Sequence, residues 1–398
     1  MANENERQAL RDYGNRKKRY KRRRMLFICT LLLIIVAVAG IYIYRLYNRS
    51  YQSYQVMKTV KNPGGQAVGY LKYGNAVVEY NKDGVVAVDK NGKQLWNGSY
   101  NMVDPIADTR GNYVAVADRG NKLIHVYNQN GDVGSIKTLH NILKVQVATQ
   151  GVVAVLMQEG ETNYIKFYYL DGTTVSEADE EGVLVDKATD VGIEGYPIDM
   201  ALSDDGKKLV VVNMSVTTGE IVSTVGFWNF GEVGKNYVDN FVGGYKFKGV
   251  IIPKVTFLNN DTVCVYKENG MMIYSIPEKP KLIHTENVNK KIESIIHNDK
   301  YTGMVLGGDT SRPKQLLLYD LKGNKILDKQ LDFKYDKISL LGDEIIMHDN
   351  VSCLILKSNG KEKFNYTFDR NIDAFYPTDS KDHYILVDDK DVSEVMLK

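Results

Sequence analysis

The sequence has little of the chemistry that most enzymes and metal proteins need. It contains three cysteines, two tryptophans and six histidines in 398 residues. Three cysteines are too few for a disulfide framework, so we expect buried free thiols at Cys264 and Cys353. His125 and His348 are interpreted as structural, because no histidines stand in a close metal-binding pattern. No nucleophile elbow or phosphate loop stands in a suitable context. We therefore expect no catalytic residue, no metal site and no cofactor.

Nucleic-acid binding is a second function class that the composition disfavours. The net charge of +2 conceals an asymmetry, because residues 1–24 hold ten Lys or Arg and three Asp or Glu. Setting these aside, together with Arg45 and Arg49, leaves 39 basic and 46 acidic residues. A mildly acidic domain lacks the basic face that phosphates require. We expect no nucleic-acid partner.

One long apolar run, residues 25–44, contains no charged side chain. A helix of this length is about 30 Å long, the thickness of the hydrocarbon core of a bilayer. The basic tail before it ends in Arg22, Arg23 and Arg24, and the positive-inside rule places such a tail in the cytoplasm. The run therefore predicts a single-pass protein of the cell membrane, with its C-terminal bulk on the outer side.

This interpretation divides the chain into four parts. They are a basic cytoplasmic tail over 1–24, a transmembrane helix over 25–44, a stalk over 45–62 and an extracytoplasmic domain over 63–398. Two questions stay open at this point. The apolar run could be a signal peptide that is cleaved after Ala39, although it continues past that residue. The tail could bind anionic lipid or a cytoplasmic partner, or it could only determine topology and stay disordered.

From about residue 63 the sequence lacks any amphipathic helical pattern, and a short motif recurs instead. A β-rich run is followed by a turn that ends in Gly and by another β-rich run, most clearly over Gly84–Trp96. Further copies have their turns at Gly131, Gly172, Gly323 and Gly360. Adjacent copies are roughly 40 residues apart, the spacing of a four-stranded propeller blade.

The copies predict an all-β fold, a β-propeller of eight or alternatively seven four-stranded blades. The last copy, from about Ile372 to Lys398, offers only three strands. The stretch Tyr54–Val60 can supply the fourth strand. Pairing the two chain ends in this way would close the ring and leave no open sheet edge.

Two segments carry a resemblance to known repeats. GVVAVDKNGKQLW, Gly84 to Trp96, resembles the pyrroloquinoline-quinone-type (PQQ-like) propeller repeat. ALSDDGKKLVVV, Ala201 to Val212, resembles the inner strands of WD40-type repeats. The whole layout is similar to an uncharacterised family of membrane-anchored propeller proteins of Gram-positive anaerobes, which implies location and fold but no activity. Quinoproteins that resemble the first repeat use an adjacent cysteine pair, which this chain lacks, so a quinone is not expected.

The loops between the second and third strands of the blades should gather on one face of the ring. They are polar and vary in length, as the loops of a recognition face do. We therefore expect a candidate binding face at Asp83, Arg119, Asn121, Glu159, Glu220, Lys267, Asp309, Arg312, Asp349, Asn350 and Asp389.

The favoured function is a non-catalytic binding, scaffold or sensor module for a protein or a cell-envelope component. The alternative is an extracytoplasmic hydrolase that acts on cell-wall glycan. A hydrolase needs two carboxyl groups that face one cleft. The carboxylates that inner strands or their loops should carry are Asp108, Asp199, Asp204, Asp205 and Asp373.

Overall fold

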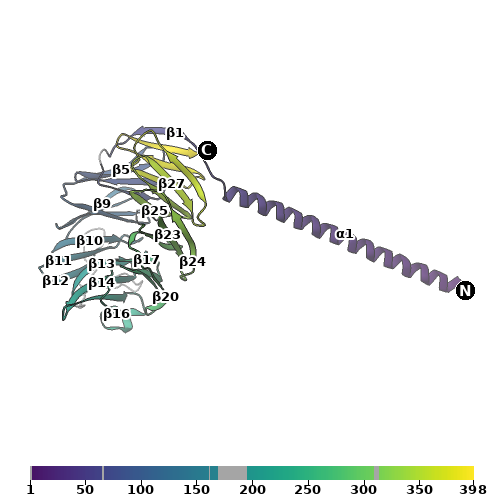
Figure 1. The fold of residues 1–398 in the computed structure, drawn as a ribbon, viewed down its shortest axis with the longest axis horizontal. Helices are drawn as coiled ribbons and strands as arrows, with labels where there is room; N and C mark the ends of the chain where they lie inside the picture. Colours follow the sequence, from purple (N-terminus) through teal and green to yellow (C-terminus); the bar gives the residue numbers. More distant parts are fainter. Residues whose placement is uncertain (1, 65–66, 161, 169–194, 309–312) are drawn as a thin grey trace. The chain divides into compact units, whose positions relative to one another are not determined.

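A computed structural model describes residues 2–398 apart from 65–66, 161, 169–194 and 309–312. The chain forms two compact units, residues 1–50 and residues 51–398. The first is a helix and the second is built of β-strands (Figure 1).

Helix α1 spans Ala2–Tyr47. Its segment Asn15–Tyr42 is long and apolar enough to cross a membrane. Within the apolar run, the hydroxyl of Thr30 donates a hydrogen bond to the carbonyl oxygen of Leu26 at 2.6 Å, which satisfies this polar group inside the helix. The basic tail, whose role was left open above, continues the same helix. Its many Arg and Lys residues are good helix formers.

The second unit is a propeller of eight antiparallel sheets, numbered here as blades 1 to 8. Blade 1 contains β2 (Gly69–Tyr73), β3 (Ala76–Tyr80), β4 (Gly84–Asp89) and β5 (Gln94–Ser99); blade 2, β6 (Pro105–Arg110), β7 (Tyr113–Asp118), β8 (Leu123–Asn128) and β9 (Gly131–Lys137); blade 3, β10 (Asn141–Val147), β11 (Val153–Glu159) and β12 (Thr162–Tyr168); blade 4, β13 (Tyr196–Leu202), β14 (Lys208–Thr217), β15 (Glu220–Asn229) and β16 (Phe241–Lys248).

Each of the other four blades has four strands. Blade 5 contains β17 (Lys254–Asn259), β18 (Thr262–Lys267), β19 (Gly270–Ser275) and β20 (Lys281–Asn287); blade 6, β21 (Ile292–His297), β22 (Tyr301–Leu306), β23 (Lys314–Asp320) and β24 (Lys325–Leu331); blade 7, β25 (Lys337–Leu341), β26 (Glu344–His348), β27 (Ser352–Lys357) and β28 (Glu362–Thr367); blade 8, β29 (Ala374–Pro377), β30 (His383–Val387), β31 (Asp391–Leu397) and β1 (Tyr54–Lys61). Two short 3₁₀ turns, Gly234–Asn236 and Val238–Asn240, lie between β15 and β16.

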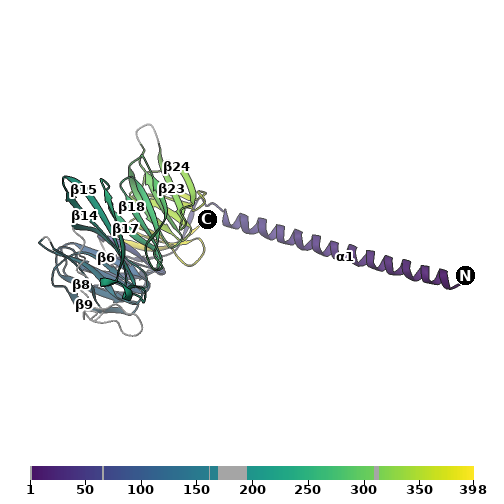
Figure 2. The same cartoon turned by 90° about the horizontal axis from the view of Figure 1, so that it is seen from below.

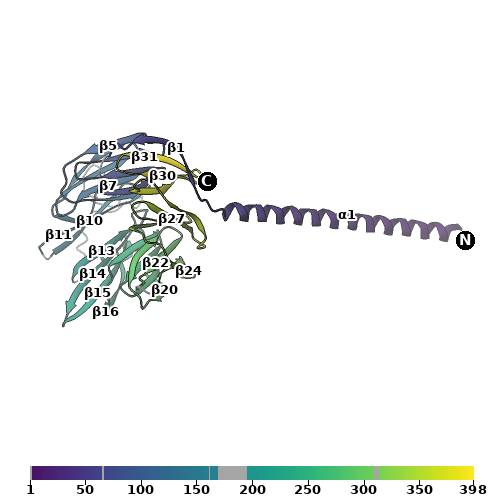
Figure 3. The same cartoon turned by 45° about the horizontal axis from the view of Figure 1, so that its top comes forward.

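Blade 8 is built from both ends of the propeller. Strand β1 pairs antiparallel with β31, from Tyr54 opposite Leu397 to Lys61 opposite Asp391. Figure 3 shows β1 beside β31 and β30. The expected eight blades and the expected ring-closing strand are therefore present.

The first strand of each blade lies innermost; the first strands of blades 1 to 5 contact their neighbours in turn, as do those of blades 6 and 7. The middle strands are covered on both sides by adjacent blades, so every residue of β18 is buried, whereas the outer strand β20 is largely exposed. Figure 2 shows the same side-by-side strands in the middle blades, with β14 beside β15 and β23 beside β24.

Eight clusters of buried apolar side chains hold the ring together, one between each pair of neighbouring blades. Between blades 1 and 2, Trp96 stacks on Tyr127 with ring centroids 5.1 Å apart. The cluster between blades 8 and 1 has no buried aromatic ring. It is formed by valines, isoleucine and alanine: Val77, Val86, Val88, Ala374, Ile385, Val387 and Val392.

The recurrent glycines lie at the turns between the third and fourth strands. Gly92, Gly131, Gly323 and Gly360 all have positive φ angles, between 72° and 106°, which L side chains rarely adopt. At Gly92 a close contact adds a second constraint, because a Cβ atom there would lie 2.5 Å from Cβ of Val60 in β1. This turn therefore packs directly against the fourth strand of the preceding blade. Gly172 lies outside the described residues.

We expect Gly92→Ala to destabilise the propeller more than Gly342→Ala. Both glycines have positive φ angles, 72° and 60°, so each substitution costs about 1–2 kcal/mol in backbone strain. Only the first adds a clash, of about 1–3 kcal/mol, because no atom lies within 4 Å of a Cβ built on Gly342. Urea unfolding of the two full-length variants measures the difference, and equal losses would contradict the packing argument.

Candidate functional site

The antiparallel blades give the propeller two distinct ends. We call one the loop face; it carries the loops between second and third strands and the connections between blades. The turn face, at the other end, carries the turns between first and second and between third and fourth strands. The register of β1 with β31 places Tyr54 at the turn face and Lys61 at the loop face. The chain therefore enters the propeller on the turn face.

Most residues of the expected binding face lie on the loop face. Asp309 and Arg312 lie outside the described residues. The other nine occupy the second-to-third-strand loops or the strand ends beside them: Asp83, Arg119, Asn121, Glu159, Glu220, Lys267, Asp349, Asn350 and Asp389. Their role in binding stays a prediction.

Several of these side chains hold their own loops in shape. Arg119 Nε lies 2.7 Å from Asp104 Oδ2, and Asn121 Nδ2 donates to Asp118 Oδ2 at 2.8 Å. Asp349 Oδ1 accepts two backbone N–H groups of its own loop, at 2.8 and 2.6 Å. These contacts hold loops and one inter-blade connection of the loop face in shape.

Asp199, one of the carboxylates proposed for hydrolysis, joins three blades near the centre of the ring. Its side chain is buried on β13 of blade 4. It accepts the ammonium of Lys144 from blade 3 and, from blade 5, the backbone N–H of Val255 at 2.9 Å. Lys254 Nζ lies 3.4 Å from the same carboxylate. Asp199 therefore acts as a tie between innermost strands.

The other inner carboxylates have similar partners. Asp108 of blade 2 accepts the backbone N–H of Val147 in blade 3 at 2.9 Å. Burial raises the pKa of Asp108, and nearby Arg110 opposes the rise. Asp204 lies 3.2 Å from Arg110 Nε, and Asp205 accepts the hydroxyl of the serine two residues earlier at 2.6 Å. These carboxylates link blades or shape turns.

Two histidines, His125 and His348, also have structural contacts. His125 stacks against the rings of Tyr100 and Tyr127, with centroids 5.6 and 6.3 Å away, and burial lowers its pKa. His348 Nδ1 lies 3.1 Å from the carbonyl oxygen of Asp349. Within the part of the chain that the structure describes, no three His, Cys, Asp or Glu side chains gather to hold a metal ion.

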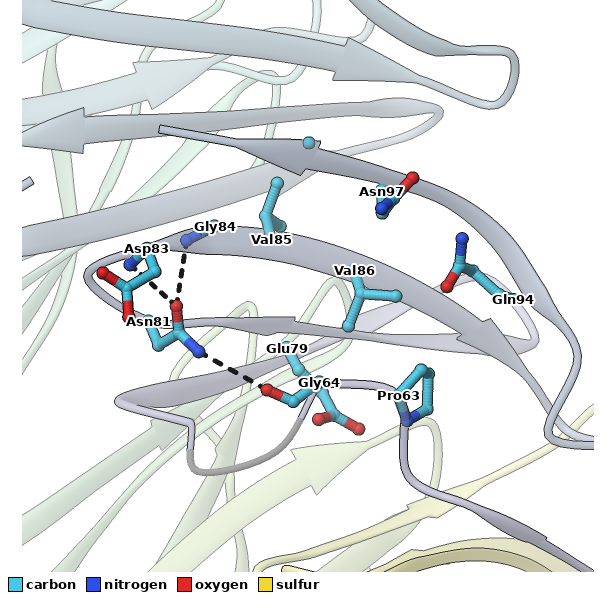
Figure 4. A pocket seen from close by; sticks show the side chains of 11 residues that line it. Pro63, Gly64, Glu79, Asn81, Asp83, Gly84, Val85, Val86, Gln94 and Asn97 are labelled. Carbon is cyan, nitrogen blue, oxygen red and sulfur yellow. Dashed lines mark hydrogen bonds between the residues drawn. The ribbon is translucent and has the colours of Figure 1, made fainter. Parts of the chain in front are cut away.

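A pocket on the loop face holds a buried acid, Glu79. We call this cavity of about 200 Å³ the Glu79 pocket; it is lined mainly by blade 1 and by the connection from β1 to β2. Figure 4 shows Glu79 beside Gly64 and Pro63, with Asn81 and Asp83 at the adjoining loop. Glu79 is 2% exposed, and within the described residues neither carboxylate oxygen makes a hydrogen bond.

The surroundings of Glu79 disfavour its charged form. Burial raises its pKa from 4.5 to about 7. The nearby side chain of Asn62 lowers the pKa of Glu79 in part, although it makes no hydrogen bond to the carboxylate. The negative charge of Asp373 raises the pKa of Glu79 further. Asp373 itself has a raised pKa, mainly through burial, with Lys337 opposing the rise. Glu79 is thus a carboxyl group that titrates near neutral pH.

Sequence reasoning missed Glu79, although a signal was present. It is the only charged residue in the strand Ala76–Tyr80, whose other residues are apolar or aromatic. An acid within a run that is buried on both faces must find a partner, change its protonation state or face a cavity. That signal singles out Glu79 but does not reveal the pocket, which depends on the connection from β1.

We expect Glu79→Gln to be more stable than the wild type at pH 8 and similar to it at pH 4.5. A carboxyl whose pKa is raised by folding stabilises the folded state only while it is protonated. This contribution is complete below about pH 4.5 and is lost as the pH rises through about 7. Glutamine never ionises, so its advantage at pH 8 reaches about 3 kcal/mol at most. Urea unfolding at both pH values measures the difference in unfolding free energy, with the exposed Glu220→Gln as the control. The same pH dependence of stability in Glu79→Gln and in the wild type would contradict the prediction.

Comparison with solved structures identifies propellers. Sqt1 of Saccharomyces cerevisiae aligns with a TM-score of 0.53 at 13% identity, over 88% of this chain and 99% of that chain. A eukaryotic initiation factor aligns with a TM-score of 0.50 at 15% identity, over 82% and 83%. Dipeptidyl peptidase 4 of Porphyromonas gingivalis aligns with a TM-score of 0.51 at 12% identity, over 81% and 56%. Such low identities show a shared fold alone.

No curated protein matches the sequence. The sequence pattern of one family does match, over residues 47–397, which includes all of the propeller except its last residue. The chain is therefore a member of DUF5711, a family of unknown function.

Proposed function

We propose that this protein is a membrane-anchored, extracytoplasmic binding module that presents the loop face of its propeller to a protein or a cell-envelope component. It acts as a scaffold or sensor and not as a catalyst. Support for the anchor comes from the apolar segment of α1 and from the basic residues before it. The fold supports binding by analogy only, since propellers host many functions.

The observation that carries the proposal is a set of exposed apolar side chains on consecutive connections of the loop face. Val68 lies between blades 8 and 1, Val103 between blades 1 and 2, and Leu139 between blades 2 and 3. They are 58%, 67% and 62% exposed. Single exposed apolar residues need no explanation, but a recurrence at equivalent connections on one face is typical of an interaction surface.

The alternative function is a hydrolase of cell-wall glycan. One observation favours it, because a carboxyl group with a pKa near 7 suits a general acid. The glycosidase mechanism also needs a second carboxylate across the same cleft. Release of sugar from cell-wall glycan by the full chain, and its loss in Glu79→Gln, would favour this alternative.

We expect the double variant Val103→Asp with Leu139→Asp to lose a partner that the wild type captures from membrane extracts of its own cells. Charges at these positions would have to be desolvated in the complex, so capture should fall at least tenfold. The control is Val238→Asp, an 85% exposed valine in the turn between the third and fourth strands of blade 4. Equal capture by all three proteins, or no enriched partner under several conditions, would contradict the proposal.

We expect Asn350→Cys on the loop face to react with a membrane-impermeant maleimide in intact cells. Ala9→Cys in the basic tail should react only after the cells are lysed, because the positive-inside rule places it in the cytoplasm. The native thiols give a low background, since Cys264 and Cys353 are buried and Cys29 lies in the apolar run. Labelling of Ala9→Cys in intact cells would contradict the topology.

A further inference from the structure

The Glu79 pocket has a chemical character that the function proposed above does not use. Its lining contains the Glu79 carboxylate, the Asp83 carboxylate and the side-chain amides of Gln94 and Asn97, and it contains no Lys or Arg among the described residues. The pocket is thus rich in hydrogen-bond acceptors. Its most buried acceptor, Glu79, uses neither oxygen within the described part of the chain.

We propose that the Glu79 pocket binds a primary ammonium group, which donates hydrogen bonds to the Glu79 carboxylate. An ammonium has three N–H donors and no acceptor, so it complements a pocket of this kind. A pairing with an opposite charge would also offset the penalty of burying the carboxylate. A metal ion is a poorer occupant, because no cluster of three His, Cys, Asp or Glu ligands is present among the described residues.

Gly64 leaves room beside the carboxylate. A Cβ atom built on this glycine would collide with Glu79 Oε2 and would lie 2.9 Å from Cγ1 of Val86. The backbone of Gly64 does not have a positive φ angle, so alanine is compatible with its conformation. Gly64→Ala should therefore obstruct the space at the carboxylate and leave the charge in place. This variant separates the effect of blocking the pocket on binding from the effect of removing the carboxylate.

The charges around Glu79 determine how binding depends on pH. Asp373 and Asp388 of blade 8 and Asp83 of the adjoining loop are acidic, and Lys82 is exposed in that loop. Tyr70 of β2 and Asn62 of the connection complete the polar surroundings. Burial raises the pKa of Tyr70, so it stays neutral in the range of interest. Because Glu79 must ionise to pair with an ammonium, binding should tighten as the pH rises towards 7 and level off above it.

The test uses the full chain in detergent micelles and 1-butylamine as the probe. Ligand-observed NMR measures the dissociation constant at pH 5.5 and pH 8. With the pKa of Glu79 at about 7, we expect binding to be roughly 30-fold tighter at pH 8. The neutral probe 1-butanol, of the same length, should not bind. A blocked lysine, with acetyl and methylamide caps, then distinguishes the side chain of a polypeptide from a free amine.

Three variants make the result specific to the pocket. Glu79→Gln should lose binding at least tenfold and retain its fold, since it removes a buried charge without changing shape. Gly64→Ala should lose binding although its carboxylate is intact, and the exposed Glu220→Gln should bind like the wild type. No binding of 1-butylamine by the wild type at pH 8 would overturn the proposal, as would binding that survives in Glu79→Gln or that does not change with pH. The result does not depend on capture of a partner, so the two proposals can fail separately.

Discussion

The propeller depends on one pairing between segments that lie more than 300 residues apart, β1 with β31. Without it, blade 8 would have three strands and a free edge. The pairing also explains the glycine at the turn of blade 1. Gly92 packs against Val60, a residue of the closing strand itself. The closing strand β1 and the Gly92 turn of blade 1 are therefore packed against each other.

A polar network fixes the chain at the point where it enters the ring. The Tyr51 hydroxyl donates to Asp382 at 2.5 Å, and Asp382 lies 2.9 Å from the ammonium of Lys363. Lys363 also pairs with Glu344 at 2.5 Å, and Glu344 accepts the hydroxyl of Tyr384 at 2.5 Å. A buried lysine is tolerated here because two carboxylates surround it, while removal of one member would leave an uncompensated charge. The network thus favours a single position of Tyr51 between blades 7 and 8.

The sequence was sufficient for the individual blades because the geometry of a blade is local. The turn over Asp89–Gly92 needs positive φ at its end, and Trp96 must be covered by a neighbouring blade, so both features could be inferred from the chain alone. The roles of Asp199 and Glu79 could not. The first depends on strands of three blades meeting at the centre, and the second on Pro63 and Gly64, which line the pocket beside blade 1. Contacts between residues of separate blades leave no repeating pattern in the sequence.

The pocket lies beside the place where the ring closes. The β1–β31 ladder belongs to blade 8, and the chain that leaves β1 continues through Pro63 and Gly64, which line the pocket, towards blade 1. The cluster between blades 8 and 1 is built of small aliphatic side chains, with the partly buried Tyr70 and Tyr376 packed against it. Glu79 lies on β3, the strand that supplies Val77 to this cluster. Strand β1 begins at the turn face, whereas the pocket and the exposed apolar connections lie at the loop face, where β1 ends. The closing strand therefore ends beside the residues for which we propose binding.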